Sequence, residues 1–340
     1  MLAIFNAAFN AVVPIILIVL LGYFLRRKQF LSDNFLSVGN KLVFRVLLPV
    51  MLFINVYNIP SFSSIPWDIV VYCIVTTLLL FALGLVAAIT GTPVPQRRGV
   101  IAQCCFRSNF ALIGLPLAAA VGNDEAIALA SVLSAFTIPL YNILAVVCLT
   151  MFLPNGNKKS AGIGHILSSV VRNPLILGVA AGLVALLVRE LQRQICGEVV
   201  FSISEDIPFL HSFLNSLKGA ATPLGLLVMG GQFDFSATKT LKKEITIGVL
   251  ARLVFAPLIG VGLGILLSSF TDLIHLGQND YPALVALCGT PTAVSSAIMA
   301  GEMDNDQQLA VQLVIWTSIG SVVTVFAIIC ALMGMGLLAI

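Results

Sequence analysis

Long, uninterrupted apolar runs constrain this chain more than any other feature. Residues 69–96, for example, contain no charged side chain. A helix needs about 20 apolar residues to cross about 30 Å of hydrocarbon, and a chain in lipid must satisfy its backbone polar groups internally. Runs of this length therefore predict helices that span a membrane.

Composition supports the same class. Hydrophobic residues make up 59% of the chain and charged residues 10%, with a mean hydropathy of +1.05. These values are far too apolar for a water-soluble domain of 340 residues. Membrane lipid is therefore the expected environment. The net charge of +3 is too small to indicate nucleic acid as a partner. The seven cysteines are odd in number and show no CxxC spacing, so neither disulfides nor a metal site is expected, and no cofactor is indicated.

The apolar runs predict an all-α integral membrane protein with ten transmembrane helices. The first run is followed, not preceded, by basic residues, so it is expected to be a retained span and not a cleaved signal. The expected spans are 3–25, 36–57, 67–90, 98–121, 125–152, 165–188, 208–232, 242–268, 281–300 and 307–337.

Basic residues predict the orientation. Lysine and arginine gather in the odd-numbered loops and their flanks, whereas the opposite side carries Arg189 and Arg193. By the positive-inside rule the odd-numbered loops are cytoplasmic and both termini lie outside. The basic residues of the odd-numbered loops and flanks are Arg26, Arg27, Lys28, Arg97, Arg98, Lys158, Lys159, Arg172, Lys239, Lys242 and Lys243.

An internal repeat relates the two halves of the chain. The stretch from Pro14 to Gly22 aligns with the stretch from Pro174 to Gly182 at an offset of 160 residues. Later matches are Pro49 with Pro223 and Leu83 with Pro257 at 174, and Asn123 with Asn305 at 182. Five spans cross an odd number of times, so the second set is inverted. The predicted units are residues 1–152, a short cytoplasmic linker 153–164, and residues 165–340.

Inverted repeats are typical of secondary transporters, which bind substrate near the midplane on discontinuous helices. The stretch RSNFALIGLP places Gly114 and Pro116 in the fourth span, and we expect the helix to break there. In the ninth span, Pro291 is the repeat equivalent of Asn109. A lone proline is more often a simple kink. Here polar side chains accompany both breaks: Asn109, Thr290, Thr292, Ser295 and Ser296.

Three cations lie deep in their predicted spans: Arg107, Lys218 and Arg252. No aspartate or glutamate occupies the middle of any span. Intramembrane cations without acidic partners favour an anionic substrate. The alternative is that each of the three binds backbone carbonyls at a helix break or reaches water.

Several stretches resemble the auxin efflux carrier family. NFALIGLPLAAAVGN is similar to its fourth-span signature, IPLYNILAVV to its fifth span, VRNPLILG to its sixth and GTPTAVSSAIMAGE to its ninth. The resemblance implies ten helices with spans four and nine crossing at broken centres, as in the bile-acid symporter and NhaA-like fold. Many relatives have a second proline where this chain has Ser296, and plant members have a long loop that is only PNGNKKSAGIGH here. Such a chain looks like a prokaryotic member.

The resemblance also implies a role: a carrier of small organic anions, auxin-like or malate- and malonate-like carboxylates, at the plasma membrane, here a bacterial inner membrane. It implies that Asn109 contacts the carboxylate, that Pro116 and Pro291 help form the crossing, and that the protein dimerises. The full set of expected substrate-site residues is Arg107, Asn109, Gly114, Pro116, Asn142, Thr290, Pro291, Thr292, Ser295 and Ser296.

Two other functions remain open at this point. A sodium-coupled symporter of the bile-acid type would use Glu302 or Gln308 for coupling. A non-transporting receptor or an enzyme is the other alternative. An enzyme is not expected, because the chain has no HExxH or GxSxG motif and no inward pair of aspartates.

Overall fold

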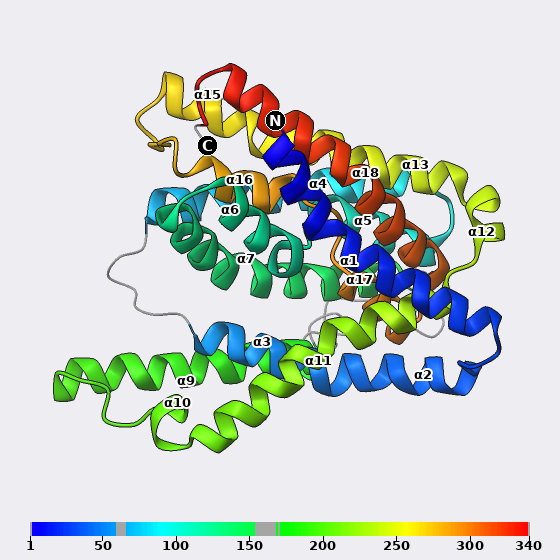
Figure 1. Ribbon diagram of the computed structural model, residues 1–340, viewed down its shortest axis with the longest axis horizontal. Helices are drawn as coiled ribbons and strands as arrows, with labels where there is room; N and C mark the ends of the chain where they lie inside the picture. Colours follow the sequence, from blue (N-terminus) through cyan, green and yellow to red (C-terminus); the bar gives the residue numbers. More distant parts are fainter. Residues whose placement is uncertain (1, 59–65, 154–167, 169–170, 339–340) are drawn as a thin grey trace.

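The computed structural model describes residues 2–58, 66–153, 168 and 171–338 (Figure 1). Regular structure in these residues is helical, apart from one isolated β-bridge between Ser108 and Thr292. Three short π-helices occur: η1 and η3 lie within continuous helical runs, and η2 begins the run that continues into α6. The predicted all-α class is confirmed for the described chain.

The elements follow in chain order. They are α1 (Leu2–Arg27), α2 (Asp33–Leu42), η1 (Val43–Leu47), α3 (Leu48–Tyr57), α4 (Trp67–Gly91), α5 (Pro95–Phe106), η2 (Phe110–Gly114), α6 (Leu115–Val121), α7 (Asp124–Met151), α9 (Pro174–Cys196), α10 (Ile203–Asp206), α11 (Pro208–Gln232), α12 (Phe235–Thr240), α13 (Lys242–Leu250), η3 (Ala251–Phe255), α14 (Ala256–Gly260), α15 (Gly262–Phe270), α16 (Tyr281–Cys288), α17 (Ser295–Glu302) and α18 (Gln307–Gly334).

Six continuous helical segments of the described residues are long and apolar enough to cross a membrane: Asp33–Tyr57, Trp67–Gly91, Asp124–Met151, Pro174–Cys196, Lys242–Phe270 and Gln307–Gly334. Large apolar side chains such as Val75, Leu187 and Val323 are exposed on them, as lipid-facing residues are. The other four predicted spans coincide with α1, α11 and the two interrupted segments α5–α6 and α16–α17. The chain is a multi-pass membrane protein.

The sixth predicted span, 165–188, is displaced. The helix in this region, α9, begins at Pro174 and continues to Cys196. Asn173 caps its start by accepting a hydrogen bond from the Leu175 backbone N–H, and Gly197 ends it with a positive φ of 81°. Residues 165–167 and most of the predicted linker 153–164 lie outside the described residues.

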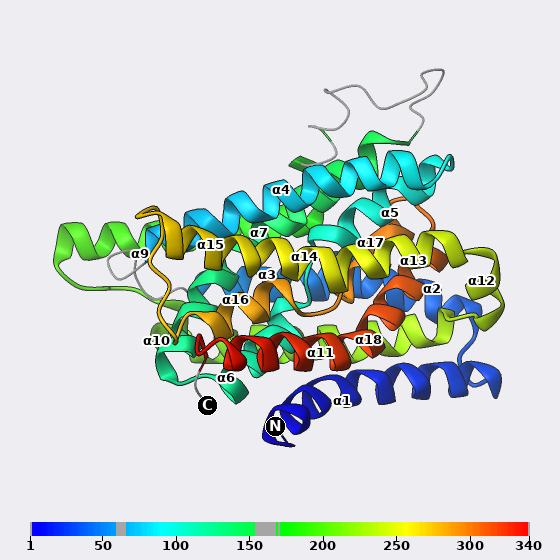
Figure 2. The ribbon, with the colours of Figure 1, turned by 90° about the horizontal axis from the view of Figure 1, so that it is seen from above.

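The helices form two layers (Figure 1). Layer A comprises α2, η1, α3, α9, α10 and α11, and layer B comprises α4 to α7 and α13 to α18. Helix α1 packs on α11 of layer A and on α18 of layer B. Figure 2, seen from above, shows α1 along one side of the molecule. The segment α10 lies at one end of the long axis and α12 at the other, and we call these ends the α10 face and the α12 face.

Two helix pairs pack closely: α1 packs on α11 of layer A, and α9 packs on α3 within layer A. A Cβ at Gly22 of α1 would overlap the carbonyl oxygen of Leu227, and a Cβ at Gly182 of α9 would lie 2.9 Å from the carbonyl oxygen of Phe53. Small residues allow membrane helices to approach this closely. Both glycines therefore act in the same way, at corresponding positions of the two aligned stretches.

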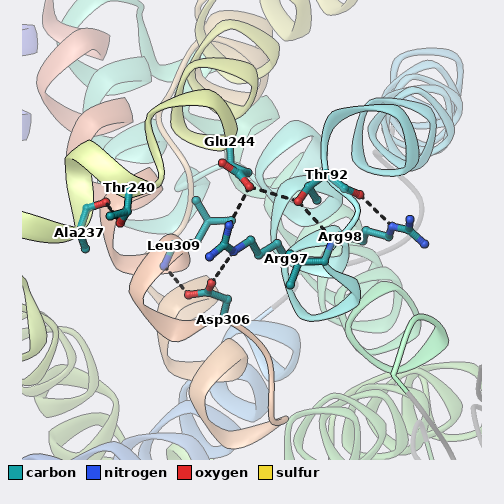
Figure 3. A network of polar contacts seen from close by, with 9 residues as sticks. Thr92, Arg97, Arg98, Ala237, Thr240, Glu244, Asp306 and Leu309 are labelled. Atoms are coloured by element: carbon teal, nitrogen blue, oxygen red, sulfur yellow. Dashed lines mark hydrogen bonds and ion pairs between the residues drawn. The ribbon is translucent and has the colours of Figure 1, made fainter.

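An ion-pair network joins three elements of layer B near the α12 face (Figure 3). Arg97, in the first turn of α5, donates from Nη1 to Glu244 Oε1 of α13 and from Nε to Asp306 Oδ2 before α18, both at 2.9 Å. Thr92 Oγ1 also donates to Glu244 Oε1, at 3.1 Å. The network fixes the start of α5 against both neighbours.

Candidate functional site

Two interrupted helical segments cross at the centre of the structure. Helix α5 ends at Phe106 and α16 ends at Cys288, and each is followed by non-helical backbone before the next helix begins. The Asn109 N–H donates to Pro291 O at 2.7 Å, and the Ala293 N–H donates to Arg107 O at 3.2 Å. The two breaks therefore pair as a short antiparallel bridge.

The fourth segment breaks earlier than the sequence predicted. Arg107 has extended backbone and Asn109 is also non-helical, whereas Gly114 and Pro116 lie within a continuous helical run from η2 into α6. The missing Pro116 N–H is tolerated because the π-helical turn before it already departs from the regular hydrogen-bond pattern. The prediction that Gly114 and Pro116 form the break was wrong.

Gly114 instead allows close packing. A Cβ at Gly114 would lie 2.9 Å from the backbone oxygen of Ala286, in α16. Its small size therefore brings η2 against the other interrupted segment. Neither Gly114 nor Pro116 lines the cavity at the crossing.

The buried side chain of Arg252 binds backbone carbonyls at both breaks. It is fully buried, and its Nε donates to Thr290 O at 2.7 Å. Nη1 donates to Cys105 O at 3.3 Å, and Nη2 donates to Leu287 O and Cys288 O, both at 3.1 Å. These oxygens lie at the carboxyl ends of α5 and α16, where unpaired carbonyls and the helix dipole attract a cation. Arg252 therefore fits the alternative stated above, in which a buried cation binds backbone carbonyls at a helix break.

Arg107 is held differently, by neutral side chains. It is 3% exposed, and Nη2 donates to Asn142 Oδ1 and to Ser295 Oγ, both at 2.8 Å. Nη1 contacts Gln103 Oε1 at 3.4 Å and Met299 Sδ at 2.6 Å. Among the described residues no carboxylate forms an ion pair with it, so its buried charge is not neutralised.

A cavity of about 60 Å³ lies at the crossing, between the two layers. Arg107, Asn109, Asn142 and Ser295 line it from layer B, and apolar side chains of α3, α9 and α11 close it from layer A. The Asn109 side chain is 3% exposed, and its Nδ2 has no hydrogen-bond partner. A buried amide donor without an acceptor is costly and unusual in a native protein. This donor and the Arg107 guanidinium line the same cavity.

The structure thus separates the predicted site residues into two groups. Thr290, Pro291, Thr292 and Ser296 are near the crossing but do not line the cavity. The Thr290 hydroxyl donates to Ala286 O, and the Thr292 N–H donates to the Thr317 hydroxyl. Ser296 lies in the first turn of α17, and its buried hydroxyl has no partner. These four hold the crossing together or flank it.

Three contributing residues were missed from the sequence. Gln103 and Met299 contact Arg107, and the Tyr141 hydroxyl lies 3.3 Å from Ser108 Oγ at the cavity wall. Gln103 precedes Arg107 by four residues and so shares its helix face, a spacing that could have identified it. The other two reach the site through tertiary packing and carry no local signal.

The cavity continues toward the α10 face. A vestibule of about 630 Å³ shares Met51, Ala111, Leu112, Ile138 and Thr222 with the cavity lining. Lys218, Asn55 and Asn58 also line this vestibule. None of its described lining residues is acidic.

A second hollow, of about 730 Å³, opens at the α12 face. It contains both predicted coupling residues, Glu302 and Gln308, and shares no lining residue with the cavity. Asn40 of α2 separates the two, because its Nδ2 donates to Glu302 Oε1 at 2.9 Å and to Ile298 O at 3.3 Å. Gln308 donates to Gln232 O at 3.2 Å. Neither coupling candidate reaches the crossing.

Helices of membrane-spanning length and exposed apolar faces around a polar, buried crossing define a class, the multi-pass membrane transport proteins. A family model described as "Membrane transport protein" matches residues 7–329, and the chain belongs to this family, the auxin efflux carrier family. The resemblance identified in the sequence is thereby confirmed. The chain is also 23% identical over 334 residues to an uncharacterized transporter of Methanothermobacter thermautotrophicus, a match that covers 94% of this chain and 97% of that relative. The protein is a secondary membrane transporter.

Proposed function

We propose that this transporter moves a small organic anion, a carboxylate, and binds it at the crossing of the two interrupted segments. The observation that carries the proposal is Arg107, a buried cation paired with neutral groups at the wall of a cavity. Burying an uncompensated charge is expensive, and a bound carboxylate would supply the missing countercharge. Arg107 and the free Asn109 Nδ2 would donate to its oxygens.

Helix polarity supports the same sign of ligand. The carboxyl ends of α5 and α16 are neutralised by Arg252. The amino ends of η2 and α17 begin at Phe110 and Ser295, which both line the cavity. Unpaired N–H groups at helix amino ends favour anions. Positive potential from side chain and backbone therefore converges on one place.

The packing also supports two inverted five-helix repeats. Gly22 and Gly182, aligned at an offset of 160 residues, contact the carbonyls of Leu227 and Phe53, which are aligned at 174. The two pairs, α1 with α11 and α9 with α3, exchange under the repeat operation. On this reading, the interrupted segments are the fourth and ninth spans of a ten-helix fold of the bile-acid symporter type.

Contacts at the starts of the interrupted segments follow the same operation. Arg97 joins the start of α5 to Asp306, at the start of α18. Asn279, before α16, donates to Glu125 Oε2 at the start of α7, at 2.6 Å. A contact between spans four and ten thus corresponds to a contact between spans nine and five.

The unequal opening of the two sides supports alternating access. The cavity joins the vestibule on the α10 face, whereas Asn40 and Gln232 of layer A hold Glu302 and Gln307 of layer B on the α12 face. We propose that layer B moves against layer A, breaks these hydrogen bonds and carries the anion past the apolar wall of α3. By the positive-inside rule the α12 face is cytoplasmic, so the observed state faces outward.

The experiment is counterflow in proteoliposomes, with labelled acetate, indole-3-acetate, malonate and malate, with and without sodium. Exchange of at least one anion by the wild type and its loss in Arg107→Gln supports the proposal. The matched control is Lys239→Gln. Lys239 is an exposed cation on α12 that lines neither the vestibule nor the hollow at the α12 face. Exchange that persists unchanged in Arg107→Gln, or no exchange of any of the four anions, would contradict it. Exchange that requires sodium and is lost in Glu302→Gln would favour the coupled symporter instead.

A further inference from the structure

Two basic side chains of layer A, Lys218 and Arg45, lie away from the crossing, one toward each side of the membrane. We propose that Lys218 and Arg45 are side-specific anion stations. Lys218 would receive the anion from the α10 face and Arg45 would receive it from the α12 face. The proposal rests on the anion transport proposed above and adds residues that determine the apparent affinity on each side.

Lys218 is placed to attract anions into the vestibule. It lies on α11, is half-buried, and lines the vestibule that continues into the cavity. Among the described residues no acidic side chain pairs with it or lines that vestibule. A hollow of one sign with low-dielectric walls raises the local concentration of the opposite ion.

Arg45 occupies the corresponding place on the other side. It lies in η1 and lines the hollow at the α12 face, with no ion pair to a described carboxylate. Four acidic side chains line this hollow: Asp304 is exposed and forms no ion pair with Arg45, and the other three are engaged elsewhere. Asp33 pairs with Arg26, Glu302 accepts from Asn40, and Asp234 accepts from Ser236. The hydroxyl and N–H of Ser236 lower the pKa of Asp234 and keep it ionised at its own site.

One face of the second span extends from Arg45 past the cavity at the crossing to the vestibule. Arg45, Leu48, Leu52 and Asn55 follow at helical spacing and line the α12-face hollow, the cavity and the vestibule in that order. Because these residues share one face, this span provides a continuous wall from one side to the other. An anion held by Arg107 of layer B would pass along it.

The internal repeat relates the two stations. Arg45 precedes Pro49 by four residues, Lys218 precedes Pro223 by five, and Pro49 and Pro223 are the aligned pair. Spans two and seven therefore each carry a cation one turn before their aligned proline. Since the repeats are inverted, the two cations fall on opposite sides of the membrane.

The test measures the KM separately at each face for labelled malonate, or for another of the four anions if the wild type exchanges only that one. The proteoliposomes' orientation is determined by impermeant maleimide labelling of the exposed Cys196. We expect Lys218→Gln to raise the KM at the α10 face about three- to tenfold and to leave the α12-face KM unchanged, as for loss of one partly screened charge contact. Arg45→Gln should do the reverse. Lys218→Arg and Arg45→Lys, which keep the charge, should restore the wild-type KM.

Ionic strength distinguishes an electrostatic role from a merely structural one. Raising the salt concentration should reduce the difference between Lys218→Gln and the wild type, because exposed charges are screened. Lys239→Gln on the α12 face and Arg193→Gln on the α10 face are the matched controls, since neither residue lines a hollow. Anion exchange with unchanged or side-independent KM values would overturn the stations alone. Absence of exchange of malonate and of the other three anions in the wild type would remove the anion transport on which they rest, and the stations with it.

Discussion

The backbone N–H of Asn109 donates a 2.7 Å hydrogen bond to the carbonyl oxygen of Pro291, and this contact joins the two interrupted segments. It uses the main chain of Asn109 and leaves the side-chain amide without a partner. One residue thus has two separable roles. Its backbone fixes the crossing, and its side chain is available to a ligand.

Asn109→Ala should therefore weaken anion binding without unfolding the protein. The backbone hydrogen bond to Pro291 is retained, and no side-chain hydrogen bond within the protein is lost. Loss of one hydrogen bond to a charged ligand costs about 1.5–3 kcal/mol, which is about a ten- to hundredfold loss of affinity. Titration calorimetry with the transported anion measures the affinity, and the melting temperature should stay near the wild-type value. An unchanged affinity would remove Asn109 from the site.

The two buried arginines should respond in opposite ways. Arg252→Gln leaves the carbonyls of Cys105, Leu287, Cys288 and Thr290 without their partner, so we expect a lower melting temperature, with about 3 kcal/mol or more of stability lost.

Arg107→Gln should abolish transport with little loss of stability, because it removes a buried charge that no described carboxylate neutralises. Arg107→Lys should restore only part of the activity, since lysine lacks the second nitrogen of the planar fork, which contacts Gln103 while Nη2 donates to Asn142 and Ser295. Thermal unfolding and counterflow of the three arginine variants provide the measurements. A destabilised Arg107→Gln that still transports would contradict this division.

The ion pairs of Arg97 should contribute to stability. The Glu244 side chain is 9% exposed, and Glu244→Gln removes the charge that Arg97 and Thr92 bind. Breaking a largely buried pair of this kind is expected to cost about 1–3 kcal/mol after allowance for the partly exposed Arg97. Glu190→Gln is the control, because the Arg193–Glu190 pair is more exposed and should be worth less than about 0.5 kcal/mol. Equal melting temperatures for the two variants would show that the network is not a stabilising one.

The glycine contacts provide a packing test. Gly22→Ala would force a Cβ against Leu227 O, and Gly182→Ala would force one against Phe53 O, so both should lower the melting temperature. Gly262→Ala is the control, because its Cβ would meet no atom within 4 Å, and alanine favours a helix over glycine. Similar losses for Gly22→Ala and Gly182→Ala are expected if their environments are equivalent. Tolerance of both substitutions would argue against the repeat-related packing.

The features that sequence predicted well are those with a direct physical cost. Apolar length predicted helices near the observed positions, and Gly114, Pro116 and Pro291 with their polar neighbours predicted that two helices would be interrupted. The cost of burying cations drew attention to Arg107 and Arg252, and both are buried in the structure. Their different roles were left open, since both are arginines in apolar helices and only their partners distinguish them.

The features that the sequence placed wrongly or missed depend mostly on contacts between segments far apart in the chain. Sequence placed the fourth break at Pro116, but the π-helical turn accommodates that proline, and pairing with Pro291 places the break at Arg107 to Asn109 instead. The start of α9 could have been found, because Asn173 followed by Pro174 is a typical helix start. The barrier formed by Asn40 and Glu302 joins residues 262 positions apart and leaves no local pattern.

The most direct test of the central claim is a thermal-shift titration of the purified protein with small mono- and dicarboxylates, in parallel for the wild type and Arg107→Gln. A ligand that binds only the folded form raises the melting temperature, and the shift grows with the ratio of ligand concentration to Kd. We expect that at least one carboxylate stabilises the wild type and that the same anion has no effect on Arg107→Gln. An anion site at the crossing would be contradicted if every carboxylate that stabilises the wild type stabilised Arg107→Gln equally. It would also be contradicted if no carboxylate stabilised either protein.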